Sequence, residues 1–322
     1  MAFTPVETSI GAVLIQLATT NFYWQRGQTI GFSSAIFQCF SKLSHNAVQI
    51  VTGMLLSSVF VNRFLPQFIP PPALSSSVPY LSLVGFIVGL GTKLGQGCTS
   101  GHMIAGLSRL RLRSLVATAS FASTAMAVVY FTGAGASLAT STPNYLPQVN
   151  MSLLTENVVI QALLASSTAL VYLVLPYLSK RAQSKHLTTA FEWVSGLLSG
   201  FLFGVGLHIA GMLNPAKTIG FLALPTPEYF DPSLALIMVF AVLPNIFVWR
   251  RISKPLLTEK FNCATSTEIP LRMIFGSALF GIGWGLLGVC PGPGLLNTVH
   301  YPSTAIYWLV AFLGGQWLGQ FL

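Results

Sequence analysis

The sequence predicts an all-α membrane protein, on three observations. Hydrophobic residues make up 53% of the 322 positions and charged residues only 7%, whereas an ordinary soluble domain carries roughly 25% charged residues. Apolar segments recur at the length that a bilayer of roughly 30 Å requires. Two glycine-rich apolar stretches, each broken at one cysteine (Cys98 and Cys290), lie 192 positions apart. We therefore predict a membrane domain built by internal duplication.

We count nine membrane-spanning segments and four shorter apolar pieces. The spans run near 8–24, 45–64, 80–97, 114–138, 156–178, 190–213, 232–249, 271–290 and 302–322. The shorter pieces resemble half-helices that enter the membrane from a loop, and they lie near 29–40, 99–109, 214–224 and 291–299. We expect residues 1–322 to form a single transmembrane transporter domain.

The distribution of positive charge predicts the orientation, because cytoplasmic loops collect Lys and Arg. With nine spans, the loops on the other side receive only Arg63 and Lys217. The N-terminus is then outside and the C-terminus cytoplasmic, in a plasma or inner membrane. Orientation accounts for the net charge of +9, so no nucleic-acid partner is expected. The predicted cytoplasmic loops hold Arg26, Lys42, Arg109, Arg111, Arg113, Lys180, Arg181, Lys185, Arg250, Arg251, Lys254, Lys260 and Arg272.

A second repeated motif indicates that the two copies are inverted. Thr29-Ile-Gly-Phe32 recurs as Thr218-Ile-Gly-Phe221, 189 positions later. The span near 156–178 has no partner, so it carries the chain across the membrane between repeat halves of about 1–140 and 190–322. Inverted repeats with broken helices are a recurrent transporter architecture, whose pathway lies at the repeat interface.

The breaks predict the pathway, because backbone exposed at membrane depth needs protein or a water-filled cavity to satisfy it. Hydroxyl groups suited to an N-cap follow Cys98, and prolines suited to a first helical turn follow Cys290 and Asn214. Helix N-termini facing the interior favour an anion. We expect no Asp in the membrane interior, which favours a weakly binding conduit over a carboxylate relay. The candidate pathway residues are Cys98, Cys290, Gly97, Thr99, Ser100, Gly101, His102, Pro291, Gly292, Asn214, Pro215, His208 and Lys217.

Three groups of residues carry a resemblance to a known family. They are Gly95-Gln-Gly-Cys98-Thr-Ser-Gly-His102 with Gly106-Leu-Ser-Arg109, then Gly204-Val-Gly-Leu-His-Ile-Ala-Gly211-Met-Leu-Asn-Pro215, then Gly281-Ile-Gly-Trp-Gly285 with Cys290-Pro-Gly-Pro293. The chain resembles the YeeE/YedE family of sulfur-compound transporters. This resemblance implies an hourglass-shaped helical protein that takes up thiosulfate, relayed between the thiols of Cys98 and Cys290.

One departure from the family leaves two alternatives open. Members with a three-cysteine pathway carry another cysteine near the first helix break, where this chain has Gly27-Gln-Thr-Ile-Gly-Phe32. Cys39 lies several positions further on. Either two cysteines suffice, or the substrate differs from thiosulfate.

Other functions compete with uptake of thiosulfate. A transporter of another small oxyanion or selenium species fits the same features, as does a membrane thiol oxidoreductase or sulfurtransferase. A purely structural subunit is a further alternative. No Cys-x-x-Cys or metal-ligand spacing occurs, so we expect no catalytic residue, metal or cofactor. The expected partners are a small anion, the lipid bilayer and a cytoplasmic protein that accepts the sulfur.

Overall fold

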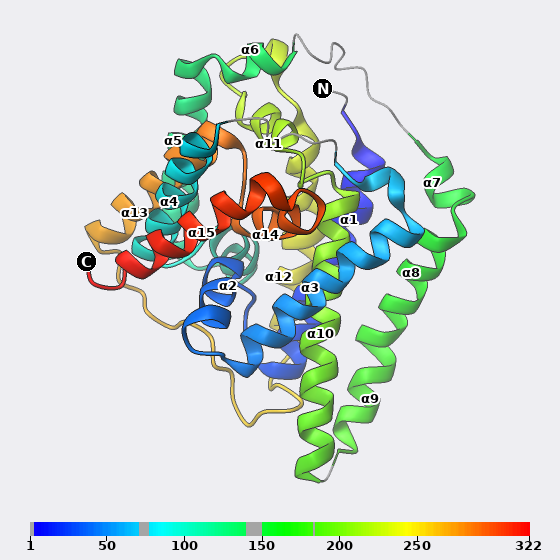
Figure 1. Cartoon of the computed structure of the whole chain (residues 1–322). Helices are drawn as coiled ribbons and strands as arrows, with labels where there is room; N and C mark the ends of the chain where they lie inside the picture. Colours follow the sequence, from blue (N-terminus) through cyan, green and yellow to red (C-terminus); the bar gives the residue numbers. More distant parts are fainter. Residues whose placement is uncertain (1–2, 71–76, 140–149, 183) are drawn as a thin grey trace.

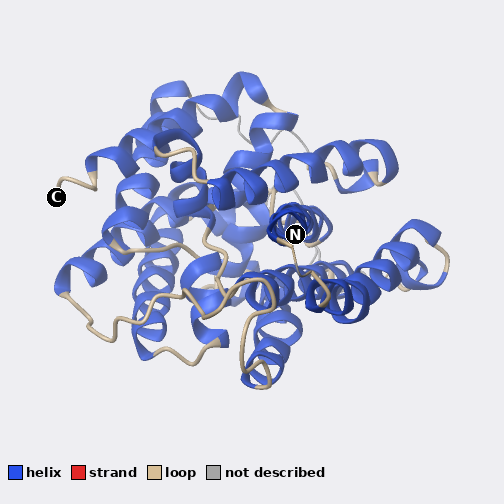
Figure 2. Cartoon of the chain, turned by 90° about the horizontal axis from the view of Figure 1, so that it is seen from below, coloured by secondary structure: helices blue, strands red, loops and turns tan. Residues whose placement is uncertain are grey.

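The computed structural model describes residues 3–70, 77–139, 150–182 and 184–322, and all regular structure within them is helical (Figures 1 and 2). Among the described residues, six segments are long and apolar enough to cross a membrane, and α4, Val78–Leu94, is a shorter apolar helix. The chain is therefore an all-α membrane protein. The six are His45–Phe64, Leu112–Thr132, Val158–Lys180, Lys185–Ile209, Pro232–Arg250 and Leu271–His300.

Helices occupy each of the nine places predicted for a span, although the count of nine spans itself stays a prediction. Several helices end three to six residues before the predicted bound, and two of them end at a glycine. Gly133 ends α5 with φ +64°, and Gly288 ends α13 with φ +72°, a left-handed conformation that glycine adopts without strain. The helices are α1 Pro5–Arg26, α3 His45–Phe64, α4 Val78–Leu94, α5 Leu112–Thr132, α8 Val158–Ala169 with α9 Leu175–Lys180, α10 Lys185–Ile209, α12 Leu243–Arg250, α13 Leu271–Leu287 and α15 Pro302–Leu318.

Short helices form at the four predicted breaks. They are α2 Phe32–Ser41, the π-helical turn η2 Ser100–Gly106, α11 Pro215–Leu222 and α14 Pro291–His300. Proline begins α11 and α14 at the first helical position, where its missing N–H costs nothing. Further short elements are η1 Pro66–Phe68, α6 Ala134–Ala139, α7 Ser152–Thr155, η3 Leu170–Val174, η4 Pro227–Tyr229, η5 Pro232–Ala235 and η6 Met238–Val242.

The long helices pack in pairs that recur between the two halves. Helix α4 packs on α13 and α15, while α13 packs in turn on α5. Likewise α10 packs on α1 and α3, while α1 packs on η6 and α12. This exchange of partners is the pattern expected of two related halves. The predicted half of about 1–140 begins and ends at positions outside the described residues.

Glycines allow the paired helices to approach backbone to backbone. A Cβ atom placed on Gly89 would lie 2.0 Å from the carbonyl oxygen of Phe312, and one placed on Gly281 would lie 2.4 Å from that of Phe121. No side chain fits at such distances. The two glycines are 192 positions apart and join α4 to α15 and α13 to α5, so the duplicated motif fixes equivalent helix contacts on either side of the core.

Candidate substrate pathway

The helix breaks meet at a buried central cavity of about 60 Å³. Water needs roughly 10–15 Å³ of such space per molecule, so the cavity has room for a few waters or one small anion. Its lining comes from the starts of α2 and α14, the segment 98–104, the end of α13, and α10, α11, η5 and η6. The lining residues are Phe32, Cys98, Thr99, Ser100, Met103, Ile104, Phe203, Leu207, Met212, Thr218, Phe221, Leu234, Met238, Trp284, Cys290, Pro291, Gly292 and Pro293.

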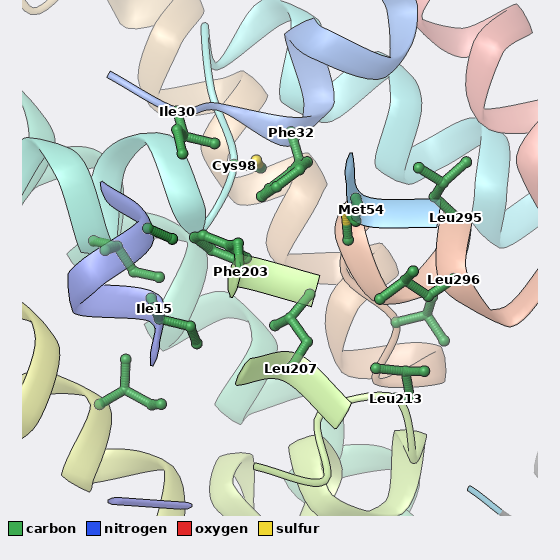
Figure 3. Packing of buried hydrophobic residues seen from close by; sticks show 14 of the residues in the cluster. Ile15, Ile30, Phe32, Met54, Cys98, Phe203, Leu207, Leu213, Leu295 and Leu296 are labelled. Atoms are coloured by element: carbon green, nitrogen blue, oxygen red, sulfur yellow. The ribbon is translucent and has the colours of Figure 1, made fainter. Parts of the chain in front are cut away.

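Both break cysteines line this cavity, and the two residues after Cys98 connect them. The Sγ atom of Cys98 lies 3.3 Å from the Ser100 hydroxyl. The Thr99 hydroxyl donates to the Sγ atom of Cys290 at 3.6 Å. Cys98 is buried next to Phe32 in the core (Figure 3). Two cysteines that are 192 positions apart in the sequence thus share one small space.

Residues at equivalent positions of the two sequence copies line the cavity together. Phe32 and Phe221, which end the repeated Thr-Ile-Gly-Phe motif, both face it, as do Cys98 and Cys290. Phe32 packs edge-on against Phe203, with ring centroids 4.6 Å apart. The duplicated motifs therefore converge on a common site.

The cavity offers hydrogen-bond donors but no charge. None of its lining residues is an Asp, Glu, Lys, Arg or His. The indole N–H of Trp284 lies beside Cys290, and within the described structure no acceptor reaches it with hydrogen-bond geometry. Trp284 is only 3% exposed and stacks on Phe280. A buried donor of this kind is available to a bound ligand.

Ser100 does not cap its own segment, as the sequence had suggested, but bonds to the preceding break, at the start of α2. Its hydroxyl accepts a hydrogen bond from the backbone N–H of Phe32 at 3.0 Å, and no side chain caps η2. Ser100 is itself the first residue of η2, and Thr99 before it already has helical backbone angles. The segment is a π-helix, a form that is frequent at functional sites. This contact joins the first and second breaks of the chain.

A second cavity, of about 260 Å³, opens beside the first, and we call it the vestibule. The two cavities share a wall, because Gly31 and Gly101 line the vestibule whereas the adjacent Phe32 and Ser100 line the central cavity. A Cβ atom on Gly31 would lie 3.9 Å from the Cα atom of Gly101, so the two backbone segments form a thin wall here, and we call this boundary between the cavities the neck. The vestibule is lined by Thr29, Ile30, Gly31, Ser33, Ser34, Gln96, Gly97, Gly101, His102, Ala105, Gly106, Arg109, Arg111, Arg113, Ser114, Ala264 and Ser266.

The predicted pathway residues divide into three groups. Six line the central cavity: Cys98, Thr99, Ser100, Cys290, Pro291 and Gly292. Three line the vestibule: Gly97, Gly101 and His102. The His102 ring lies against Gly97 and bonds to the Gly95 carbonyl at 3.0 Å and to the Ser114 hydroxyl at 3.2 Å.

The remaining four predicted residues line neither cavity. The His208 ring is bonded to the Gly204 carbonyl at 2.7 Å and to the His300 ring at 2.9 Å. Asn214 caps α11 by accepting from the N–H of Ala216 at 3.0 Å, and Pro215 is the first residue of that helix. These groups shape the fold around the pathway.

Lys217 is held in a buried ion pair. Its Nζ atom lies 2.9 Å from Asp231 Oδ2, 2.6 Å from the Thr4 hydroxyl and 2.8 Å from the Ser233 hydroxyl. Asp231 is fully buried within the protein, directly before the membrane-spanning segment Pro232–Arg250, and the absence of an Asp from the membrane interior stays a prediction. The carboxylate is tolerated because Lys217 and Ser233 satisfy it.

Sequence reasoning missed the apolar and aromatic half of the cavity lining and the arginines of the vestibule. Phe32 and Phe221 carried a signal, because they end the repeated motif, whereas Leu207 and Met238 carried none. Orientation in the membrane is enough to explain Arg109, Arg111 and Arg113 on a cytoplasmic loop. The sequence therefore contains no sign that these arginines also line a cavity. Cys39, at the end of α2, lines neither cavity.

Helices broken around a buried cavity, in a chain with several spans, define this protein as a membrane transporter. Residues 4–127 match the family model described as "Sulphur transport", and residues 191–322 match one described as "Family of unknown function (DUF6691)". The unpaired segment near 156–178 lies between the two matches.

Curated proteins named "Probable transporter" from Xylella fastidiosa are similar to this chain. One from strain Temecula1 is 33% identical over 134 residues, 41% of this chain and 90% of that protein. One from strain 9a5c is 39% identical over 136 residues, 41% of this chain and 91% of that protein. The chain belongs to the YeeE/YedE-type family of sulfur transporters.

Proposed function

We propose that the chain takes up thiosulfate, or a closely similar small sulfur anion, through the central cavity. The observation that carries the proposal is the presence of Cys98 and Cys290, from equivalent breaks, in one small uncharged cavity. The sulfur-transport family supports the cargo class. The exchange of helix partners between halves supports an inverted repeat, with the N-terminus outside as the charge distribution predicts.

The donors around the cavity suit a soft anion that must also leave. A cysteine thiol is a weak, polarisable S–H donor, and the Thr99 hydroxyl and the Trp284 indole add stronger ones. A bare ion in a low-dielectric medium costs tens of kcal/mol by a Born estimate, whereas a helix N-terminus contributes ~0.3–2 kcal/mol. Several weak donors therefore share the anion, and conduction requires binding weak enough for release.

No bond to the substrate is made or broken in this mechanism. The anion passes from one thiol to the other by exchanging S–H contacts, so both cysteines stay reduced. The outer Lys217–Asp231 pair acts structurally rather than as the anion's binding group. A cytoplasmic protein that accepts the sulfur stays a prediction.

Uptake of labelled thiosulfate into proteoliposomes tests the proposal. A Cys98→Ala, Cys290→Ala double variant is expected to lose uptake, and a matched Cys39→Ala, Cys263→Ala variant to keep it, because those cysteines lie outside the central cavity. Wild-type uptake by a folded Cys98, Cys290 double variant would remove the thiols from the mechanism. A persulfide found at either thiol by mass spectrometry during turnover would instead favour a sulfurtransferase.

Competition in the same assay defines the cargo. Sulfate, selenite and other small oxyanions are expected to compete less well than thiosulfate, since they lack its terminal sulfur. Repeating uptake with and without a proton gradient separates coupled transport from passive conduction.

A further inference from the structure

The loop of residues 251–270 contributes Ala264 and Ser266 to the lining of the vestibule and is hydrogen-bonded to the end of α1. It lies on the lower side of the molecule in Figure 1, and Figure 2 views that side. The N–H groups of Leu256 and Leu257 donate to the carbonyls of Trp24 and Gln25, each at 2.9 Å. The carbonyl of Gly27 accepts from the N–H of Asn262 at 2.8 Å and from the thiol of Cys263 at 3.3 Å.

Three arginines of the vestibule hold the far part of this loop. Arg109 donates to the carbonyl of Ala264 at 3.1 Å, and Arg111 donates to the carbonyls of Thr265 and Ser266 at 2.5 and 2.6 Å. Arg113 donates to the hydroxyl of Ser266 at 2.7 Å and also to the side chain of Gln96. All these acceptors are neutral, so carbonyl and hydroxyl oxygens occupy the guanidinium donors.

None of the three arginines forms an ion pair within the described residues. The ion pairs found within the described residues are Arg26 with Glu192 and Lys217 with Asp231, and neither pair involves the vestibule. No lining residue of the vestibule is acidic. A cavity lined by one sign of charge concentrates ions of the other sign, and a guanidinium can hold an oxyanion by two parallel charge-assisted hydrogen bonds.

The vestibule also offers space and further donors. Its volume of about 260 Å³ exceeds that of the central cavity several-fold. Ser33 and Ser34, in the first turn of α2, line it together with the arginines. The neck at Gly31 and Gly101 places this space directly beside the proposed transport cavity.

We propose that the vestibule is a second anion site, which binds a tetrahedral oxyanion such as sulfate or thiosulfate on Arg109, Arg111 and Arg113. The oxygens of the anion replace the carbonyls of residues 264–266 on the guanidinium groups, and this exchange releases the loop from the vestibule. The site itself does not depend on thiol-mediated uptake. Only its use by transported thiosulfate rests on the proposed function.

The experiment measures binding and loop release in the full chain, in lipid nanodiscs and without transport. Sodium sulfate is titrated by calorimetry against sodium chloride at matched ionic strength, and the labelling rate of Cys263 by N-ethylmaleimide is followed by peptide mass spectrometry. Sulfate, unlike chloride, is expected to bind and to accelerate Cys263 labelling several-fold. An Arg111→Gln, Arg113→Gln variant is expected to bind sulfate roughly tenfold more weakly or worse, with labelling that is fast from the start and insensitive to sulfate.

The matched control is Arg181→Gln, because Arg181 stacks on Tyr177 outside the vestibule; it should behave as wild type. If the glutamine variant does not fold, an Arg111→Lys, Arg113→Lys variant replaces it. Lysine keeps the positive charge but lacks the planar pair of guanidinium donors, so an intermediate affinity for sulfate is expected. Unchanged sulfate binding in a folded arginine variant, or sulfate binding without any change at Cys263, would overturn the proposal. Sulfate binding that survives in the Cys98→Ala, Cys290→Ala variant separates this site from the proposed transport mechanism.

Discussion

The central cavity and the vestibule are adjacent, yet their chemistry is opposite. The first is small, with sulfur, aromatic and hydroxyl groups and no charged side chain, while the second is larger and is lined by three arginines and no acidic residue. They are separated by the neck where the N–H of Phe32 bonds to Ser100. Charged side chains therefore line the vestibule but not the central cavity.

This difference follows from the cost of moving an anion out of water. In the wide vestibule an anion keeps part of its hydration, so arginines can attract it without a large loss of hydration. In the narrow cavity a fixed positive charge would hold the anion too firmly for conduction. Weak neutral donors leave the anion mobile. The comparison predicts that the same change of charge has different consequences on the two sides of the neck.

The largest expected effect comes from placing one negative charge in each region. In Thr218→Asp a carboxylate faces the central cavity without a partner, and thiosulfate uptake should fall roughly 100-fold or more, as for an uncompensated buried charge. In Ser34→Asp the carboxylate lies in the vestibule, where Ser34 is exposed. Uptake should fall only a few-fold there and should recover at higher ionic strength. Uptake into proteoliposomes at two salt concentrations measures both.

Asparagine variants at the same positions are the controls, because they match the size of Asp without its charge. Thr218→Asn should retain most uptake and Ser34→Asn nearly all of it. If the two Asp variants lost uptake equally and independently of salt, the proposed difference between the vestibule and the central cavity would be contradicted.

The packing that supports the two regions also differs, and two neighbouring glycines of α15 test this. A Cβ atom on Gly315 would lie 2.2 Å from the carbonyl oxygen of Phe86, whereas one on Gly314 would meet nothing within 4 Å. Gly315→Ala should therefore destabilise the protein by about 1–3 kcal/mol through overpacking of α15 on α4. Gly314→Ala should be neutral or slightly stabilising. Thermal unfolding in detergent compares the two.

The same pair of variants shows which region depends on this packing. Helix α4 leads into Cys98, so Gly315→Ala should reduce uptake. The loop at the vestibule is hydrogen-bonded to the end of α1 and to Arg109, Arg111 and Arg113 instead, so labelling of Cys263 should be unchanged. Faster Cys263 labelling in Gly315→Ala would mean that the vestibule, like the central cavity, depends on the packing of α15 on α4.

The helices and the meeting of the two cysteines could be predicted from the sequence. Apolar length and glycine or proline breaks are local properties, and the offset of 192 positions pairs Cys98 with Cys290. The direction in which a side chain points across the core depends instead on how distant helices pack, which the local sequence does not show. Nothing at Leu207 or Met238 distinguishes a residue facing a cavity from one packed against a helix, and Lys217 found its partner Asp231 through the fold of a connecting segment.

The vestibule illustrates a different reason why prediction falls short. Positive residues near a membrane surface orient the chain whatever else they do. The sequence therefore cannot separate an arginine that sets topology from one that also binds an anion. That distinction needs the loop of residues 264–266 in place on the guanidinium groups, a contact across more than 150 positions.

The neck itself is tested by Ser100→Ala. Removal of the hydroxyl leaves the buried N–H of Phe32 without its acceptor, at a cost of about 1–3 kcal/mol of stability. The loss should widen the junction between the cavities and raise the access of a small thiol reagent to Cys98. Ser34→Ala is the control, because its hydroxyl bonds within its own turn, to the carbonyl of Gly31. Unchanged Cys98 labelling and stability would show that another contact closes the neck.

The smallest expected effect concerns the thiol that reports on the loop. Burial raises the pKa of Cys263, and the positive charge of Arg109 lowers it. The thiolate is the form that reacts, so maleimide labelling should rise with pH to a midpoint above that of free cysteine. In Arg109→Gln the favourable charge is lost, and the midpoint should move further upward. Arg109→Lys should keep the midpoint near the wild-type value.

The opposite shift would have a different cause. Arg109 also holds the carbonyl of Ala264, so if its removal frees the loop, the thiol of Cys263 becomes hydrated and its midpoint moves downward. A downward midpoint in Arg109→Gln would therefore show that Arg109 acts on Cys263 as a clasp on the loop and not through its charge.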